Sequence, residues 1–143
     1  MALPESILAV DPATTYGFAL WRHGRLTESG ARSLAGDSNG SKLDDWDRYL
    51  GKIMPHVSTV AYEAPVIYRG RRPNWLAYQL EGVLLLRSYR LRVPVYAAPP
   101  SQIKKAATGN GRATKDQVRV AMRESWKIGK LKDVENRIQG LLK

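Results

Sequence analysis

The stretch that decides the fold is Ile7-Leu8-Ala9-Val10-Asp11-Pro12, a short apolar run that ends in a carboxylate. The run predicts a buried strand, which Pro12 and the turn after it bring to an end. A carboxylate at the end of a buried strand is costly unless it is paired or binds a metal. Glu63 repeats this situation in Val60-Ala61-Tyr62-Glu63-Ala64-Pro65. Two acids on two expected strands indicate a shared site.

A third element with polar ligands lies near the C-terminus. In a helix over 133–142, Asp133 and Asn136 are three residues apart and lie on one face. Carboxylate and amide oxygens suit Mg²⁺ or Mn²⁺, whereas a zinc site calls for His or Cys. The chain has no Cys and only His23 and His56, neither with a neighbour at ligand spacing. The acids therefore point to Mg²⁺, with Mn²⁺ as a plausible substitute.

Length and composition favour a single domain over 1–143, large enough to bury a core without disulfides. Zero Cys excludes a disulfide scaffold and a cysteine nucleophile. No secretory signal is expected at the N-terminus, and the apolar runs are too short to span a bilayer. We therefore expect no membrane association and a cytoplasmic protein, in the host cytoplasm if the source is viral.

The charge balance is strongly basic. The chain carries 23 Lys and Arg against 13 Asp and Glu, a formal net charge of +10. Such a surface attracts polyanions, with nucleic acid ahead of an anionic membrane. A solvated basic surface without a specific partner is the alternative.

The hydrophobic pattern predicts an α/β domain with a mixed sheet flanked by helices. Three antiparallel strands come first, with a hairpin turn at His23-Gly24. If the first and fourth strands are parallel neighbours, Asp11 and Glu63 come together. The expected strands are 7–11, 16–22, 25–34, 58–64 and 93–98, with Pro94 marking an edge or a strand start. The expected helices are 43–55 starting at Ser41 or the turn after it, 74–90, 101–107 capped by Ser101, 115–126 capped by Thr114, and 133–142.

One set of residues, spaced so as to lie on one side of a helix, is mostly apolar. Its residues are Trp75, Leu76, Gln79, Leu80, Val83 and Leu84. We expect this stripe to be core or a dimer interface and not a ligand site.

Five motifs in this order resemble RuvC-type Holliday junction resolvases, most nearly the short phage-type members. The motifs are Ile7-Leu8-Ala9-Val10-Asp11-Pro12-Ala13-Thr14-Thr15-Tyr16-Gly17, Tyr62-Glu63-Ala64-Pro65, Pro99-Pro100-Ser101-Gln102-Ile103-Lys104-Lys105, Thr108-Gly109-Asn110-Gly111-Arg112-Ala113-Thr114-Lys115 and Asp133-x-x-Asn136. The resemblance covers nearly the whole chain. It implies a ribonuclease H-like sheet with strands 1–3 antiparallel and strands 1, 4 and 5 parallel. It also implies a homodimer that cuts four-way DNA junctions by magnesium-dependent phosphodiester hydrolysis.

The resemblance assigns roles by position. Asp11 and Glu63 match the first two catalytic acids of the family and Asp133 the third. Asp11 would bridge two metal ions, with Glu63 holding one and Asp133 the other. Lys115 matches a lysine near the scissile phosphate. Taken singly, each acid also has a structural explanation, as a turn residue, an edge carboxylate or a charge favoured by the helix dipole.

Asn136 departs from the family, which has Asp there. An amide oxygen is a neutral and weaker ligand than a carboxylate. The chain could be an engineered variant that traps substrate, a natural member that works with three acids, or a protein that binds junctions without cutting them. We favour the first interpretation.

The basic loops are the candidate DNA-binding surface. Its residues are Arg69, Arg71 and Arg72 in one loop and Lys104, Lys105, Arg112 and Lys115 further on. Tyr68 matches a loop that supplies a residue to the junction centre in the family. The alternative is a surface aromatic that packs on Arg69. As rivals to the resolvase function we keep a non-cutting junction binder and another ribonuclease H-like nuclease acting on branched DNA or hybrids.

Overall fold

The computed structural model describes residues 5–117 and 120–121. The chain divides into two compact units, a first unit of residues 4–97 and a second unit of residues 98–143 with 1–3. The single domain expected over 1–143 stays a prediction. Over the described ranges, none of the helices has the length and apolar character needed to cross a membrane.

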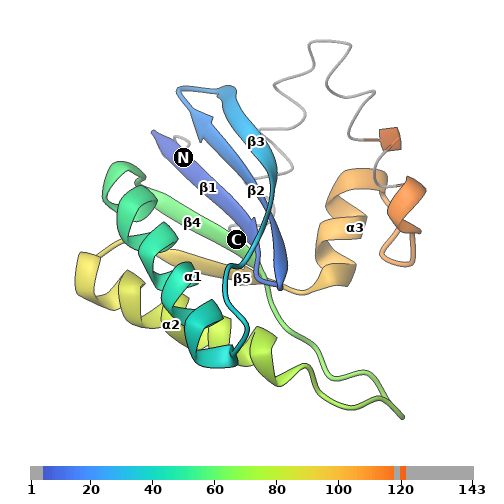
Figure 1. The fold of residues 1–143 in the computed structure, drawn as a ribbon. Helices are drawn as coiled ribbons and strands as arrows, with labels where there is room; N and C mark the ends of the chain where they lie inside the picture. The colour runs from blue at the N-terminus through green and yellow to red at the C-terminus, as the bar shows by residue number, and fades with distance from the viewer. Residues whose placement is uncertain (1–4, 118–119, 122–143) are drawn as a thin grey trace. The chain divides into compact units, whose positions relative to one another are not determined.

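The first unit is built on a mixed sheet, which confirms the predicted fold class (Figure 1). Its strands are β1 (Ser6–Asp11), β2 (Thr15–Arg22), β3 (Arg25–Ser33), β4 (Thr59–Glu63) and β5 (Val95–Ala98), in the order β3-β2-β1-β4-β5. β2 runs antiparallel to both β1 and β3, whereas β4 runs parallel to β1. The predicted neighbourhood of the first and fourth strands is therefore confirmed.

Two long helices cover one face of this sheet. They are α1 (Asn39–Ile53), which continues into the 3₁₀ turn η1 (Met54–His56), and α2 (Trp75–Leu91). Figure 1 draws both on the same side of the strands. The second unit contributes α3 (Pro100–Thr108), and residues 115–117 and 120–121 are helical as well.

The start of α1 lies earlier in the chain than expected. Ser38, not Ser41, is the N-cap, because its side chain accepts from the Ser41 backbone N–H at 3.1 Å. The Ser41 hydroxyl in turn accepts from the Ser38 backbone N–H at 3.1 Å. This reciprocal capping box satisfies two backbone donors at the helix start, so the helix begins at Asn39.

Two other boundaries also differ from expectation. The cap of α3 is Pro99 and not Ser101, because Pro100 occupies the first helical position, where no backbone donor is needed. β5 begins at Val95 and not at residue 93, because the Val93 backbone N–H donates to the Ser88 carbonyl at the end of α2. β5 is an edge strand, as Pro94 indicated.

The hairpin between β2 and β3 turns at the expected residues. His23 and Gly24 both have positive φ, at 49° and 74°. Positive φ at both central residues is typical of a type I′ turn, whose twist matches that of the flanking strands.

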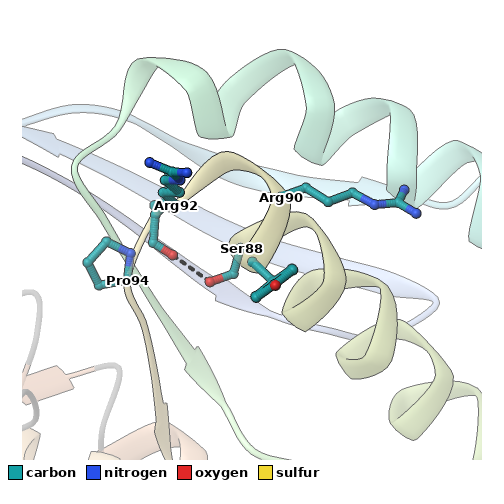
Figure 2. A pocket seen from close by; sticks show the side chains of 6 residues that line it. Ser88, Arg90, Arg92 and Pro94 are labelled. Carbon is teal, nitrogen blue, oxygen red and sulfur yellow. Dashed lines mark hydrogen bonds between the residues drawn. The ribbon is translucent and has the colours of Figure 1, made fainter.

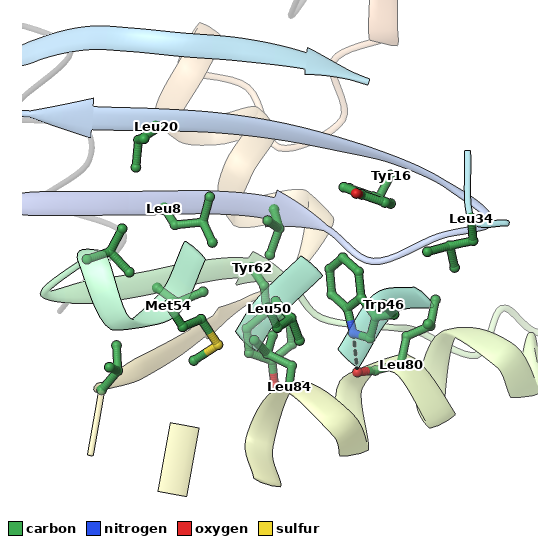
Figure 3. Close-up of a cluster of buried hydrophobic side chains, with 14 residues drawn as sticks. Leu8, Tyr16, Leu20, Leu34, Trp46, Leu50, Met54, Tyr62, Leu80 and Leu84 are labelled. Atoms are coloured by element: carbon green, nitrogen blue, oxygen red, sulfur yellow. Dashed lines mark hydrogen bonds between the residues drawn. The ribbon is translucent and has the colours of Figure 1, made fainter. Parts of the chain in front are cut away.

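The hydrophobic core lies between the sheet and the two helices (Figure 3). Leu8 and Val60 of the sheet and Leu50 and Leu84 of the helices are fully or almost fully buried. Part of the stripe expected as core or interface is core, since Leu80 and Leu84 are buried. Trp75, however, is 66% exposed.

A reciprocal serine clamp sets the register of β1 and β4 at their first residues. The Ser6 backbone N–H donates to Ser58 Oγ at 2.9 Å, and the Ser58 backbone N–H donates to Ser6 Oγ at 2.9 Å. The Ser58 hydroxyl also donates to the Ser6 carbonyl at 2.7 Å. Because a slip of one residue would break all of these bonds, the clamp favours a single register.

Trp46 fills the centre of the core, and its indole N–H donates to the Leu80 carbonyl at 2.9 Å. We expect Trp46→Phe to lower the free energy of unfolding by about 1–3 kcal/mol, because it removes a buried hydrogen bond and leaves a cavity. Chemical denaturation measures the change. Tyr68→Phe is the control, because Tyr68 is 58% exposed and should change stability by less than about 0.5 kcal/mol. Equal effects of the two substitutions would contradict the assignment of Trp46 to the core.

Candidate active site

The pairing of β1 with β4 brings the first two candidate acids together. The register runs from Ile7 opposite Thr59 to Val10 opposite Tyr62. One further residue along both strands brings Asp11 level with Glu63. Neighbouring strands lie about 4.8 Å apart, so the two carboxylates start from adjacent positions.

Both acids also project from the same face of the sheet. Side chains alternate along a strand, and Val10 and Tyr62 belong to the buried core under the helices. Asp11 and Glu63 therefore face away from α1 and α2. Asp11 is exposed and Glu63 is half-buried. This is the arrangement that the sequence predicted for a shared site.

The strand on the other side of β1 leaves room beside Asp11. Gly17 of β2 is the register partner of Asp11, and Ala19 is the partner of Ala9 one step away on the same face. Among the described residues, the atom nearest to a Cβ built on Gly17 is the Gly30 carbonyl oxygen at 4.0 Å. The strand positions beside Asp11 are thus occupied by small residues.

The basic loop follows Glu63 directly and leaves the sheet at the same edge, as the green segment between β4 and α2 in Figure 1 shows. The Arg71 backbone N–H donates to the Tyr68 carbonyl at 3.1 Å, and Gly70 has φ of 77°. This is the pattern of a type II turn, which needs positive φ at its third residue. The loop exposes its basic side chains Arg69, Arg71 and Arg72, and Tyr68 is 58% exposed.

The other basic candidates belong to the second unit. Lys105, Arg112 and Lys115 are exposed and Lys104 is half-buried. Lys115 begins a helix as predicted, because the Gln117 backbone N–H donates to Thr114 Oγ1 at 3.2 Å, and the Gln117 side chain accepts from the Thr114 N–H at 2.9 Å. Their distance from Asp11 and Glu63 stays a matter of prediction.

Asp133 and Asn136, the remaining candidate ligands, lie outside the described residues. In the described part of the chain, His, Cys, Asp and Glu side chains form no group of three or more that could hold a metal ion. The carboxylates of Asp11 and Glu63 are thus the described half of the predicted ligand set.

One buried polar pair close to the site was missed by the sequence analysis. The Tyr62 hydroxyl donates to the Glu81 carboxylate of α2 at 2.7 Å. Burial, and then the hydrogen bond and charge of Glu81, raise the pKa of Tyr62, so the phenol stays a donor at neutral pH. The available signal was an acid at Glu81 on the same helical face as the buried Ala77 and Leu84. The pair ties the end of β4, next to Glu63, to α2.

We expect Tyr62→Phe to lower the free energy of unfolding by about 1–3 kcal/mol, because the Glu81 carboxylate loses its donor in a partly buried position. Glu81→Gln keeps an acceptor oxygen and should cost less. The double variant Tyr62→Phe/Glu81→Leu removes both partners and should be more stable than Tyr62→Phe alone. Denaturant unfolding of these variants together with the single variant Glu81→Leu gives the coupling energy, and strictly additive effects would show that the pair contributes nothing.

The family model for the crossover junction endodeoxyribonuclease RuvC matches residues 44–136 of the chain. A RuvC from Anaeromyxobacter dehalogenans (strain 2CP-C) is 33% identical over 124 residues, covering 78% of this chain and 64% of that protein. A RuvC from Heliobacterium modesticaldum (strain ATCC 51547 / Ice1) is 32% identical over 127 residues, covering 82% of this chain and 77% of that protein. The chain thus spans just under two thirds of the Anaeromyxobacter relative. The phage-type subclass stays a prediction.

Solved structures agree on the fold. RuvC of Thermus thermophilus superimposes with a TM-score of 0.68 at 22% identity, covering 83% of this chain and 78% of that one. The structure described as T. thermophilus RuvC in complex with Holliday junction substrate gives a TM-score of 0.67 at 22% identity, covering 84% and 78%. With the family model spanning residues 44–136 and both acids in register on one sheet face, the chain belongs to the RuvC family of crossover junction endodeoxyribonucleases.

Proposed function

We propose that the chain is a structure-selective endonuclease that binds four-way DNA junctions and hydrolyses phosphodiester bonds with a divalent metal ion. The observation that carries this proposal is the register of β1 and β4, which brings Asp11 and Glu63 level on the face of the sheet away from α1 and α2. Membership of the RuvC family supplies the substrate class, and a relative of the same fold is described in complex with a Holliday junction substrate.

The described donor set fits Mg²⁺ or Mn²⁺. Both donors are carboxylates, the oxygen ligands that these hard cations prefer, and the strand residue paired with Asp11 is Gly17, which adds no side chain beside it. Asp11, Glu63 and Asp133 would hold the metal, with Asn136 as a neutral fourth donor. When bound, the metal supplies Lewis-acid stabilisation of the phosphate and lowers the pKa of an attacking water.

The chain's own cations support the same reaction. Lys115 at its helix start would stabilise negative charge that develops on the scissile phosphate. A lysine in the first turn opposes the helix dipole, so its presence there favours a role with an anion. The exposed arginines of the 64–74 loop, Arg69, Arg71 and Arg72, would hold the flanking backbone, with Tyr68 available to stack on a base. Lys104, Lys105 and Arg112 would extend this surface in the second unit.

We further propose a homodimer, because cutting two opposite strands of a junction needs two sites related by a two-fold axis. The outer face of α2 is the surface that favours a second copy. Trp75 is 66% exposed, Leu85 and Leu86 are each 47% exposed, and Tyr89 is 83% exposed. These four side chains lie on the side of the helix opposite the buried Leu80 and Leu84. We place the protein in the cytoplasm, where its DNA substrate is found.

Asn136 supports a second candidate function. A protein that keeps the fold and the basic surface but lacks a charged fourth ligand would bind junctions without cutting them. Restoring a carboxylate at residue 136 distinguishes the two functions. A resolvase inactivated by Asn136 would gain cleavage activity, whereas a protein that only binds junctions would not.

The deciding experiment is cleavage of a labelled four-way junction in Mg²⁺ or Mn²⁺ by the unchanged chain and by Asn136→Asp. We expect the substituted chain to make symmetric nicks at least about a hundredfold faster, because the added carboxylate neutralises and positions the metal. If neither protein cuts while both bind the junction tightly, the chain is a junction binder. A preference for RNA–DNA hybrid over the junction in competition would contradict the resolvase assignment.

Asp11→Asn in the Asn136→Asp background is the control for the metal site. We expect it to abolish cleavage and to leave junction binding within about tenfold, because it removes ligand charge and not the basic surface. A collapse of binding together with loss of the folded circular dichroism spectrum would mean that Asp11 is structural.

For the dimer, we expect Leu86→Glu to convert a dimer to a monomer, because it places a charge at the centre of the apolar face. Sedimentation equilibrium measures the mass. Ile67→Glu is the matched control, since Ile67 is 60% exposed but lies in the 64–74 loop. A monomeric unchanged protein, or a dimer that survives Leu86→Glu, would overturn the assignment of this face.

A further inference from the structure

Apart from the arginines of the 64–74 loop, two groups of cations stand out in the first unit. On the helical side, arginines are paired with acids of α1. Arg32 lies 3.3 Å from Asp45, and Arg48 lies 3.0 Å from Asp44. Arg87 donates two hydrogen bonds to the carboxylate of Asp47, at 2.6 and 2.9 Å, which hold the pKa of that carboxyl below its usual range.

The second group gathers at the end of the sheet opposite the acids, where β1 and β4 begin, and this end is here called the remote edge. Hydrogen bonds join its parts. The His23 N–H donates to the Glu5 carbonyl at 2.9 Å, and the Arg22 guanidinium donates to the His56 carbonyl at 3.1 Å. The Val60 N–H donates to the Pro94 carbonyl at 2.9 Å. The cations of this edge are Arg22, Arg25, Lys52, Arg90 and Arg92.

Acids do not neutralise this group in the described part of the chain. No Asp or Glu of residues 5–117 lies within salt-bridge distance of these five side chains, since the ion pairs among the described residues involve His23, Arg32, Arg48 and Arg87. Glu5 is the described acid of this edge, and its nearest cationic partner is His23 at 3.8 Å. Arg90 lies near enough to Asp47 to act on it, but Arg87 occupies that carboxylate.

The hairpin adds a second, independent observation. Arg22 and Arg25 are direct register partners at the end of β2 and β3. Like charges directly opposite each other destabilise a hairpin, so this position gains from an anion that contacts both. Nothing in the hairpin itself needs two arginines, because His23 and Gly24 make the turn.

A hollow at the end of α2 is lined by two of these arginines, Arg90 and Arg92. Its wall consists of Ser88, Tyr89, Arg90, Arg92, Val93 and Pro94 (Figure 2). The Arg92 backbone is fixed, because its N–H donates to the carbonyls of Ser88 and Tyr89 while Val93 is buried beside it. Arg90 and Arg92 are nevertheless exposed.

We propose that the remote edge binds the sugar-phosphate backbone of a DNA arm away from the cut, an inference that rests on the proposed function. Arginine forks match phosphate oxygens in geometry and charge. The six residues of β1 place this edge about 17 Å from Asp11 at about 3.3 Å per residue. At about 3.4 Å per nucleotide along a strand, the contacted phosphates lie at least about five nucleotides from the scissile one.

The test compares the unchanged chain, Arg90→Gln/Arg92→Gln and the control Arg48→Gln on a four-way junction with long arms. Arg48 is exposed but paired with Asp44, so the control removes a cation that is already neutralised. We expect the double variant to bind the junction about tenfold or more weakly. The slope of log K against log salt should become shallower by about two, since each phosphate contact contributes about 0.9. The control should keep its affinity within about twofold.

Phosphate ethylation interference locates the contact. Signals at least about five nucleotides from the cut should vanish in the double variant, while signals at the cut stay. Arg71→Gln/Arg72→Gln should do the reverse, because that loop lies at the edge with the acids. If Arg90→Gln/Arg92→Gln changes neither the salt slope nor the interference signals far from the cut, this inference is wrong while the proposed function stands. An acidic protein would then be the partner of the remote edge. Absence of junction binding by the unchanged chain would instead overturn the proposed function.

Discussion

The parallel pairing of β1 with β4 is the constraint on which the candidate site depends. Side chains alternate along each strand, so a slip of one residue would move Glu63 to the core face and leave Asp11 alone on the other. The helices enforce the choice, because Val10 and Tyr62 must be buried beneath them. At the other end of the strands, the Ser6 and Ser58 clamp holds the same register by hydrogen bonds. Apolar burial and polar clamping thus select one alignment, and this alignment brings the two carboxylates together.

Bringing two carboxylates together is unfavourable unless a cation neutralises them, so the ends of the strands that carry them need support from the rest of the fold. Two hydrogen bonds supply such support. Tyr62 anchors the end of β4 to Glu81, and Trp46 joins α1 to α2 through the Leu80 carbonyl. Neither interaction is on the face that carries the acids. The stabilising contacts lie on the helical face of the sheet, and Gly17, Ala9 and Ala19 place small side chains beside Asp11 on the other face.

The strands could be predicted from the sequence, because short apolar runs ending in Asp11 and Glu63 are a local pattern. The parallel pairing that brings the two acids together is not local, and it was implied by the resemblance to RuvC-type resolvases. Helix ends were harder, because a cap is chosen by competition between neighbouring residues. Ser38 and Ser41 are both good caps, and only the reciprocal bonds between them decide which one begins α1. The Tyr62–Glu81 pair was missed for a similar reason, since a hydrogen bond across 19 residues leaves no periodic signal.

The same physics separates the two kinds of arginine in the first unit. Arg48 and Arg87 face acids of the helical layer, and each pair needs no external partner. Arg71 in the loop after Glu63 and Arg92 at the remote edge have no such acid within salt-bridge distance in the described residues. Within the first unit, these unpaired arginines lie at the two opposite ends of one sheet. That distribution suits a long polyanion better than a small anion, because a small anion would need only one of the two edges.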